Sequence, residues 1–347
     1  MTPLLEVRNV RKVFGGGKSD TTVALEGVSF SVSSEHPSIT GIVGESGSGK
    51  TTLARLMLGI IGPTHGYLFH RGRDVAAMSR RERREFRLEV QPIFQDPFDV
   101  FNPFYHVDHA LAVPIRHFKL ADSRREVQRM VAEAVEAVGL RPSETLGRYP
   151  HQLSGGQCQR IMVARAFLIQ PRVIVADEPV SMIDASLRAT ILGSLQRLNR
   201  ELAISVVYIT HDLMTAYQIC ENIIVFYRGS IVEAGSVERV IRSPKHPYTQ
   251  LLISSTPLPD PKRRWGEDAI VEEESTRRST SGCKFAPRCP SAHEPCWTTV
   301  PSLCRTDADR AAACFLCSDG PVLENEEINQ VFAPPQAENA PTLPEAN

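Results

Sequence analysis

A glycine-rich loop constrains this chain more than any other feature. Residues Gly44–Thr51 fit the pattern G-x-x-x-x-G-K-[ST]. Glycines let a backbone curl around an anion with its N–H groups pointing inward, and a helix that follows adds its positive end. The apolar run Ile39–Val43 predicts a strand before this phosphate loop, and Thr51–Leu58 predicts a helix after it. The order strand, loop and helix favours a phosphate-binding site in an α/β fold over an ordinary glycine turn.

The types of residue in the phosphate loop assign chemical roles. Lys50 is expected to reach the β- and γ-phosphates of a nucleoside triphosphate, and the Thr51 hydroxyl is expected to bind Mg²⁺. The expected nucleotide contacts of the loop are Gly44, Glu45, Ser46, Gly47, Ser48, Gly49, Lys50, Thr51 and Thr52.

A pair of adjacent acids follows a second apolar run. Val173–Ala176 predicts a buried strand that ends at Asp177 and Glu178. Asp177 is expected to hold Mg²⁺ through water, and Glu178 is expected to polarise water near the γ-phosphate. Two acids at a strand end can also form a solvated turn, but the phosphate loop upstream makes that alternative weaker.

The remaining pattern alternates strands with helices. Leu4–Val13 and Val23–Ser33 alternate apolar and polar residues, and Ser205–Ile209 is a β-branched run. This order predicts a mainly parallel sheet covered by helices on both faces. Helices are expected over Ser79–Glu89, Ser123–Val138 and Leu187–Leu202.

Composition narrows the class of partner. The formal net charge of −1 over 347 residues gives no overall field that points to nucleic acid or to an anionic membrane. The longest apolar runs, such as Ile223–Tyr227, are too short to cross a bilayer, and Met1–Arg8 lacks the apolar core of a secretory signal. The chain is therefore expected at the cytoplasmic face of a membrane only through partners.

A pentapeptide between the two nucleotide motifs carries a family resemblance. Leu153–Gln157, Leu-Ser-Gly-Gly-Gln, resembles the signature of ABC ATPases, and the resemblance covers about residues 4–260. Within it, Gln95 matches the Q-loop glutamine, Asp184 the D-loop aspartate and His211 the switch histidine. Phe14 stands where the family has an aromatic ring that stacks on adenine. The signature contacts to nucleotide would be Ser154, Gly155, Gly156 and Gln157.

The resemblance implies a fold and a mechanism. The fold would be a RecA-like parallel-sheet core with an antiparallel β subdomain and an α-helical signature subdomain. The signature loop of one subunit would close over ATP held by the phosphate loop of another, with donors from Ser154 and Gly156. Glu178 would be the general base, His211 would contact the γ-phosphate and the water, and Gln95 would bind Mg²⁺ and assist catalysis.

Further stretches resemble the ATPases of dipeptide, oligopeptide and nickel importers. They are Tyr149–His151, His246–Thr249 and Gly282–Pro290. The resemblance implies several partners: two integral-membrane permeases and a second ATPase subunit that is a paralogue of this chain. An extracytoplasmic solute-binding protein would be an indirect partner. Dipeptides, longer peptides and nickel chelates all remain open as substrates. Soluble ABC proteins of translation, DNA repair or phosphonate degradation are the alternative class.

The aromatic segment after Gln95 is a candidate contact with the permeases. Phe98–Tyr105 carries four aromatic residues on a turn-rich stretch. They are expected to receive a cytoplasmic helix of the permease, because a loop of this kind buries such side chains poorly. The alternative is that these rings pack inside the helical subdomain.

Six of the eight cysteines crowd into the C-terminal part. Cys283, Cys289, Cys296 and Cys314 match the cysteines of the peptide-importer ending, which implies a [4Fe–4S] cluster. Zn²⁺ and free or oxidised thiols are the alternatives. Cys304 and Cys317 are surplus to a four-ligand site and could substitute as ligands.

Four regions follow from these observations. We expect an ATPase domain over residues 1–260, a linker over 261–281, a metal-stabilised cysteine segment over 282–319 and a disordered tail over 320–347. The cysteine segment lies outside the nucleotide motifs in the sequence. Its role is therefore expected to be structural and separate from ATP binding.

Overall fold

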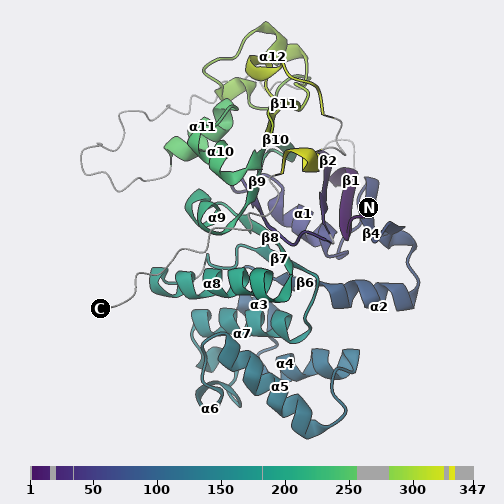
Figure 1. Cartoon of the computed structure of the whole chain (residues 1–347), viewed down its shortest axis with the longest axis vertical. Helices are drawn as coiled ribbons and strands as arrows, with labels where there is room; N and C mark the ends of the chain where they lie inside the picture. The colour runs from purple at the N-terminus through teal and green to yellow at the C-terminus, as the bar shows by residue number, and fades with distance from the viewer. Residues whose placement is uncertain are drawn as a thin grey trace, which may run out of the picture.

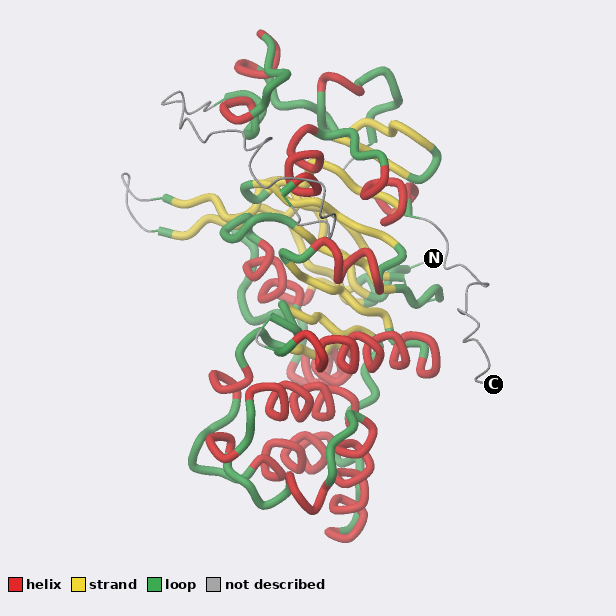
Figure 2. Tube along the Cα trace, turned by 90° about the vertical axis from the view of Figure 1, so that its left-hand side faces the viewer, coloured by secondary structure: helices red, strands yellow, loops and turns green. Residues whose placement is uncertain are grey.

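The computed structural model describes residues 2–15, 21–33, 35–181, 183–255, 281–323 and 328–332. The molecule is elongated, with a sheet-rich half above a helix-rich half (Figures 1 and 2). Within the described ranges, no helix is both long and apolar enough to span a bilayer.

The main sheet has eight strands in the order β11-β12-β10-β9-β3-β8-β7-β6. The strands from β9 to β6 run parallel, whereas β10, β12 and β11 are added antiparallel at one edge. Their bounds are β3 Ile39–Val43, β6 Val90–Ile93, β7 Val173–Asp177, β8 Ser205–Thr210, β9 Asn222–Tyr227, β10 Ser230–Ser236, β11 Cys304–Asp307 and β12 Arg310–Ala312.

Alternation along the parallel strands divides their side chains between two cores. In β8, Val206 and Tyr208 join the core shared with the helix-rich half, while Val207 and Ile209 join the core on the opposite face. Parallel strands are buried on both faces, which is why such runs read as continuous apolar stretches in the sequence.

A second, antiparallel sheet covers the opposite core together with α1. Its order is β2-β1-β4-β5, and Leu25 and Val28 of β2 share a core with Leu53 of α1. Its strands are β1 Leu5–Phe14, β2 Thr22–Val32, β4 His65–His70 and β5 Arg73–Asp74.

Helices α4 to α7 form the lower half of the molecule (Figure 1). The Ser123 side chain caps α5 by accepting the Glu126 N–H, and buried residues such as Val127 and Val131 form a stripe along this helix. The helices are α1 Lys50–Met57, α2 Arg80–Glu89, α3 Pro97–Val100, α4 Val107–Phe118, α5 Arg124–Ala137, α6 Pro142–Thr145, α7 Gly155–Leu168, α8 Ala185–Leu202, α9 Leu213–Ile219, α10 Val237–Arg242, α11 Pro247–Ser254 and α12 Glu294–Thr298.

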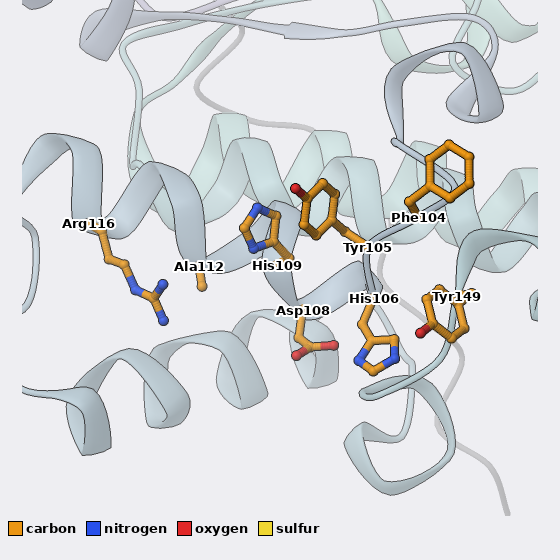
Figure 3. A pocket seen from close by; sticks show the side chains of 8 residues that line it. All are labelled: Phe104, Tyr105, His106, Asp108, His109, Ala112, Arg116 and Tyr149. Atoms are coloured by element: carbon orange, nitrogen blue, oxygen red, sulfur yellow. The ribbon is translucent and has the colours of Figure 1, made fainter.

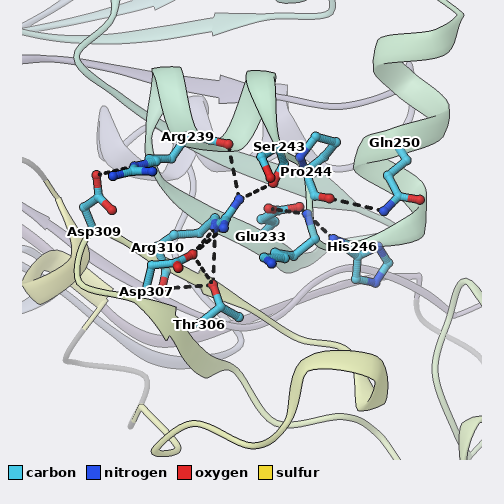
Figure 4. Close-up of polar contacts among 11 residues, drawn as sticks. Glu233, Arg239, Ser243, Pro244, His246, Gln250, Thr306, Asp307, Asp309 and Arg310 are labelled. Atoms are coloured by element: carbon cyan, nitrogen blue, oxygen red, sulfur yellow. Dashed lines mark hydrogen bonds and ion pairs between the residues drawn. The ribbon is translucent and has the colours of Figure 1, made fainter.

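The cysteine segment is joined to the main sheet through β12. Arg310 of β12 is 3% exposed, and its guanidinium donates to the backbone carbonyls of Arg239 and Ser243 and pairs with Asp307 (Figure 4). A buried guanidinium is tolerated because these acceptors replace water. The segment therefore shares a sheet with the ATPase domain instead of forming a lobe with its own core.

Part of the tail is ordered, which corrects the expectation of disorder there. A short 3-10 helix, η5 Ile328–Val331, buries Ile328 and Val331 against the sheets. The Asn329 side chain exchanges two hydrogen bonds with the backbone of Ser31 in β2, at 2.8 and 2.6 Å. Residues 333–347, and all of the expected linker except residue 281, lie outside the described residues.

Most elements expected from the sequence are present with small changes at their ends. The strand Ile39–Val43 is confirmed, and the helix expected over Leu187–Leu202 begins at Ala185. Strands β6, β11 and β12 were not predicted, because runs of three or four residues show too little alternation. Other elements, among them α4, β9 and β10, were not predicted either.

Candidate nucleotide site

The phosphate loop joins β3 to α1 and depends on two glycines. Gly44 has φ 156°, and a Cβ there would lie 2.2 Å from the carbonyl oxygen of Phe226. Gly49 has φ 104°, and a Cβ there would lie 2.4 Å from the carbonyl oxygen of Ala24. No side chain caps α1 at Gly49. The first N–H groups of the helix are therefore left for an anion.

Lys50 is buried inside the curve of this loop. The residue is only 5% exposed, and its Nζ donates to the carbonyl oxygens of Gly44 and Glu45 at 2.6 and 2.8 Å. Burial lowers the pKa of Lys50, whereas the charges of Glu178 and Asp177 oppose that shift. The ammonium thus lies between the loop and the two acids, where it would neutralise the negative charge of a phosphate group.

Asp177 presents an oxygen without a protein partner. The residue is 6% exposed, and its Oδ1 is buried with no hydrogen bond among the described residues. Burial raises the pKa of Asp177, and a hydrogen bond from the Thr51 side chain lowers it. A hydroxyl beside an unsatisfied carboxylate oxygen is a donor set that suits Mg²⁺. The sequence placed both residues at such a site, and here they lie side by side.

Glu178 gathers two side chains that are far away in the sequence. Gln95 Nε2 donates to its Oε2 at 3.0 Å, and His211 Nδ1 lies 2.9 Å from its Oε1. The three residues follow β6, β7 and β8, which are adjacent parallel strands, so they meet at one edge of the sheet. Glu178 has φ 45°, an unusual backbone conformation that its N–H bond to the carbonyl of Ile209 helps to hold.

The signature residues lie in the other half of the molecule. Ser154 caps α7 in a reciprocal pair with Gln157, each side chain accepting the backbone N–H of the other residue. Ser154 and Asp184 are exposed, while Gly156 is buried against Leu187 of α8. Helix α7 belongs to the helix-rich half and α1 to the sheet-rich half (Figure 1). Ser154 and Asp184 are therefore exposed at the starts of α7 and α8, whereas Lys50 begins α1 in the sheet-rich half.

Phe14 lies at the end of β1. It is 43% exposed, and Lys12 Nζ lies 5.2 Å from its ring centre. An exposed ring beside a cation is compatible with stacking on a base.

Helix α7 is tied directly to the segment that carries Gln95. The Phe94 carbonyl accepts from Gln159 Nε2 at 3.0 Å, and the Phe94 N–H donates to Met162 Sδ at 3.3 Å. Sequence patterns had not assigned a role to Gln159, which is 2% exposed and has its Oε1 without a partner among the described residues. The only sign of such a role in the sequence is a polar residue at a position of the signature helix that is otherwise apolar.

The four cysteines of the expected cluster line one small cavity. Cys283, Cys289, Cys296 and Cys314 all contribute to its wall. Burial raises the pKa of Cys283 and of Cys289, and a negative charge on Cys314 would raise both further. Across the described ranges, no three His, Cys, Asp or Glu side chains come close enough to hold a metal ion. The iron–sulfur expectation is therefore left without direct support.

The segment Phe98–Tyr105 divides between core and surface. Phe101 is 4% exposed and packs in the core, whereas Phe104 is 84% exposed. Tyr105 stacks on His109 with ring centres 4.4 Å apart. Phe104, Tyr105 and His109 border a cleft of about 320 Å³ together with Tyr149 (Figure 3).

Fold and site together define an ATPase of the ABC class. The family described as "ABC transporter" matches residues 25–181, and the one described as "Oligopeptide/dipeptide transporter, C-terminal region" matches residues 232–296. The dimeric ATP-binding cassette MJ0796, solved with ADP and Pi, superposes with a TM-score of 0.61 and 27% identity, covering 67% of this chain and 98% of that chain.

Similar proteins of known family narrow the ABC class to peptide importers. The oligopeptide transport ATP-binding protein OppF of Salmonella typhimurium is 41% identical over 266 residues, covering 76% of this chain and 79% of that protein. A Brucella ovis protein, provisionally named a peptide import ATP-binding protein, is 40% identical over 315 residues, covering 90% and 98%. The chain belongs to the family of ATP-binding subunits of peptide-importing ABC transporters.

Proposed function

We propose that this chain binds and hydrolyses ATP to energise the import of peptides through partner permeases in a membrane. The observation that carries the ATPase role is the convergence of Gln95 and His211 on Glu178, beside Lys50 and Asp177. The names of the relatives support peptides as the transported class.

The arrangement supports a general-base role for Glu178. Its carboxylate would accept a proton from the attacking water as the water oxygen bonds to the γ-phosphorus and the bond to ADP breaks. His211 would hold the water and the γ-phosphate, and Gln95 would link the Mg²⁺ to the same carboxylate. Mg²⁺, when bound by Thr51 and Asp177, would neutralise charge on the β- and γ-phosphates.

A substitution at Glu178 tests this role. Glu178→Gln keeps the shape of the side chain but removes the proton acceptor. We expect ATP binding to be unchanged and turnover of the assembled transporter to fall about 100- to 10,000-fold, with a closed dimer accumulating. Near-normal turnover in that variant would show that Glu178 is not the base.

We further propose a composite site in which the second ATPase subunit, a paralogue of this chain, supplies a signature loop to the phosphate loop described here. The exposed cap of α7 at Ser154 and the exposed Asp184 support it, because both are free to face another subunit. The complex would also contain two permeases, with an extracytoplasmic solute-binding protein acting indirectly.

The four cysteines that share a cavity support a [4Fe–4S] cluster as the bound group. Four thiolates are the usual ligand set of such a cluster, and Cys283, Cys289, Cys296 and Cys314 would supply them. Protein purified without oxygen should contain iron and sulfide at about four each per chain. Stoichiometric zinc without iron would instead identify the rival metal.

A further inference from the structure

The phosphate loop is held by the C-terminal part of the chain at one residue, Glu45. Arg288 Nη1 and Nη2 donate to its two carboxylate oxygens at 2.9 and 3.0 Å. The Glu45 N–H donates to Tyr248 Oη at 2.8 Å, and its carbonyl accepts from Lys50 Nζ at 2.8 Å. All the polar groups of this loop residue are thus bonded. The cysteine segment therefore contacts the phosphate loop directly, although the two lie far apart in the sequence; its separate, structural role stays a prediction.

Arg288 is itself held in a fixed position. Its guanidinium lies 5.8 Å from the ring centre of Phe285 and 6.0 Å from that of Tyr227. Phe285 is 1% exposed and packs edge-on against Tyr248 at 5.5 Å. A planar guanidinium that rests on rings and meets a carboxylate with two bonds loses little freedom on pairing, so the contact fixes position well.

The same residues border the cysteine cavity. Phe285 lines it together with Cys283 and Cys289, and Arg288 directly precedes Cys289 in the chain. The Arg288 N–H donates to the Phe285 carbonyl in the short 3-10 helix η3, Ala286–Arg288. The position of the guanidinium therefore depends on how the cysteine segment folds.

The negative charge of Glu45 explains why the contact with Arg288 would favour ATP binding. Glu45 places a carboxylate in a loop that is shaped for a triphosphate, and like charges repel. Burial lowers the pKa of Lys50, and the Glu45 carboxylate is one of the charges close enough to oppose that shift. Arg288 neutralises this carboxylate by bonding both of its oxygens, which leaves the Lys50 charge available to phosphate.

We propose that Arg288 and Tyr248 are positioning residues of the nucleotide site, which hold Glu45 and so make ATP affinity depend on the folded cysteine segment. They act through Glu45 and are not catalytic residues. The inference rests on the proposed function, since it assumes that ATP binds at Gly44–Thr51. It adds a contact through which the state of the cysteine segment reaches the phosphate loop.

Equilibrium binding of Mg·ATP to the full-length chain tests the proposal. Arg288→Ala should weaken binding about three- to tenfold, and Arg288→Lys should recover only part of that loss, because it restores the charge but not the two-bonded contact. In a Glu45→Gln background, Arg288→Ala should have less than about a twofold effect, because the carboxylate to be neutralised is gone. Tyr248→Phe should weaken binding about two- to threefold, since it leaves the Glu45 N–H without its acceptor.

Arg239→Ala is the matched control. Arg239 pairs with Asp309 at 3.7 Å, so this variant also removes an arginine–carboxylate contact between the ATPase domain and the C-terminal part, but one away from the loop (Figure 4). Unfolding temperatures of all variants separate lost stability from lost affinity. ATP affinity that falls equally in Arg239→Ala, or falls as much from Arg288→Ala in the Glu45→Gln background, overturns the proposal.

Lys50→Ala separates this inference from the proposed function. If Lys50→Ala loses ATP while Arg288→Ala binds as the unaltered chain does, only the positioning role fails. If Lys50→Ala binds ATP normally, the nucleotide lies elsewhere and both proposals fail.

Discussion

The phosphate-loop half and the signature half of the nucleotide site differ in how this chain holds them. Lys50 is buried, and Glu178 is bonded to two side chains from neighbouring strands. Ser154 and Asp184 are exposed, and among the residues that the structure describes the Ser154 side chain bonds only within the cap of its own helix. One half is complete within the chain, whereas the other is an outward surface. If the composite site is as proposed, we expect this chain alone to bind ATP and to need a second subunit for turnover.

The largest expected effects would separate the two halves. Lys50→Ala should weaken ATP binding to the isolated chain about 10- to 100-fold, because it removes hydrogen bonds to a charged phosphate. Ser154→Ala should leave that binding within about twofold, since Ser154 caps α7 in the helix-rich half, whereas Lys50 begins α1 in the sheet-rich half. Titration of each purified chain with Mg·ATP measures both.

The same Ser154 variant should act only after assembly. Turnover of the complete transporter should fall about tenfold or more in Ser154→Ala, because a donor to the neighbour's γ-phosphate is lost. If Ser154→Ala weakened ATP binding to the isolated chain as much as Lys50→Ala does, the division into two halves would be wrong.

A smaller effect is expected at the exposed aromatic surface of the helix-rich half. Phe104→Asp should weaken association with the permeases about tenfold, because an exposed ring is a typical interface anchor, and should leave ATP binding by the isolated chain unchanged. Tyr67→Asp is the matched control, since Tyr67 is 54% exposed on the antiparallel sheet. If crosslinks from the segment Phe98–Tyr105 reached only its own subunit, its aromatic rings would instead pack within the helical subdomain.

The smallest effect concerns Cys158, directly after the signature. The thiol is fully buried, burial raises its pKa to about 11, and its Sγ lies 3.5 Å from the carbonyl of Pro150. The reactive thiolate is therefore scarce near neutral pH, and labelling of Cys158 should be much slower in the folded chain than in the unfolded chain at both pH 7 and pH 9. Mass spectrometry of the peptide that contains Cys158 checks this. Rapid labelling at pH 8 without unfolding would mean that α7 opens readily.

Much of the site was predictable because its chemistry sits in short contiguous stretches. The phosphate loop, the Asp177–Glu178 pair and the Ser154 cap each need a fixed local backbone, so each is written in a few neighbouring residues. The strand Ile39–Val43 was predictable for the same reason, since buried parallel strands are continuous apolar runs. Strand β12 was not, because it has only three residues and one of its partners, β10, lies far away in the sequence.

The sequence by itself thus determined the class of chemistry, because backbone curvature around phosphate and adjacent carboxylates are local properties. Only the tertiary structure decided which distant groups complete the site. Strand order brings Gln95 and His211 to Glu178, and the folding of the cysteine segment brings Arg288 to Glu45 across 243 positions of chain. Such pairs leave no periodic or spacing signal, because a contact between distant segments is fixed by sheet order and packing and not by neighbouring residues.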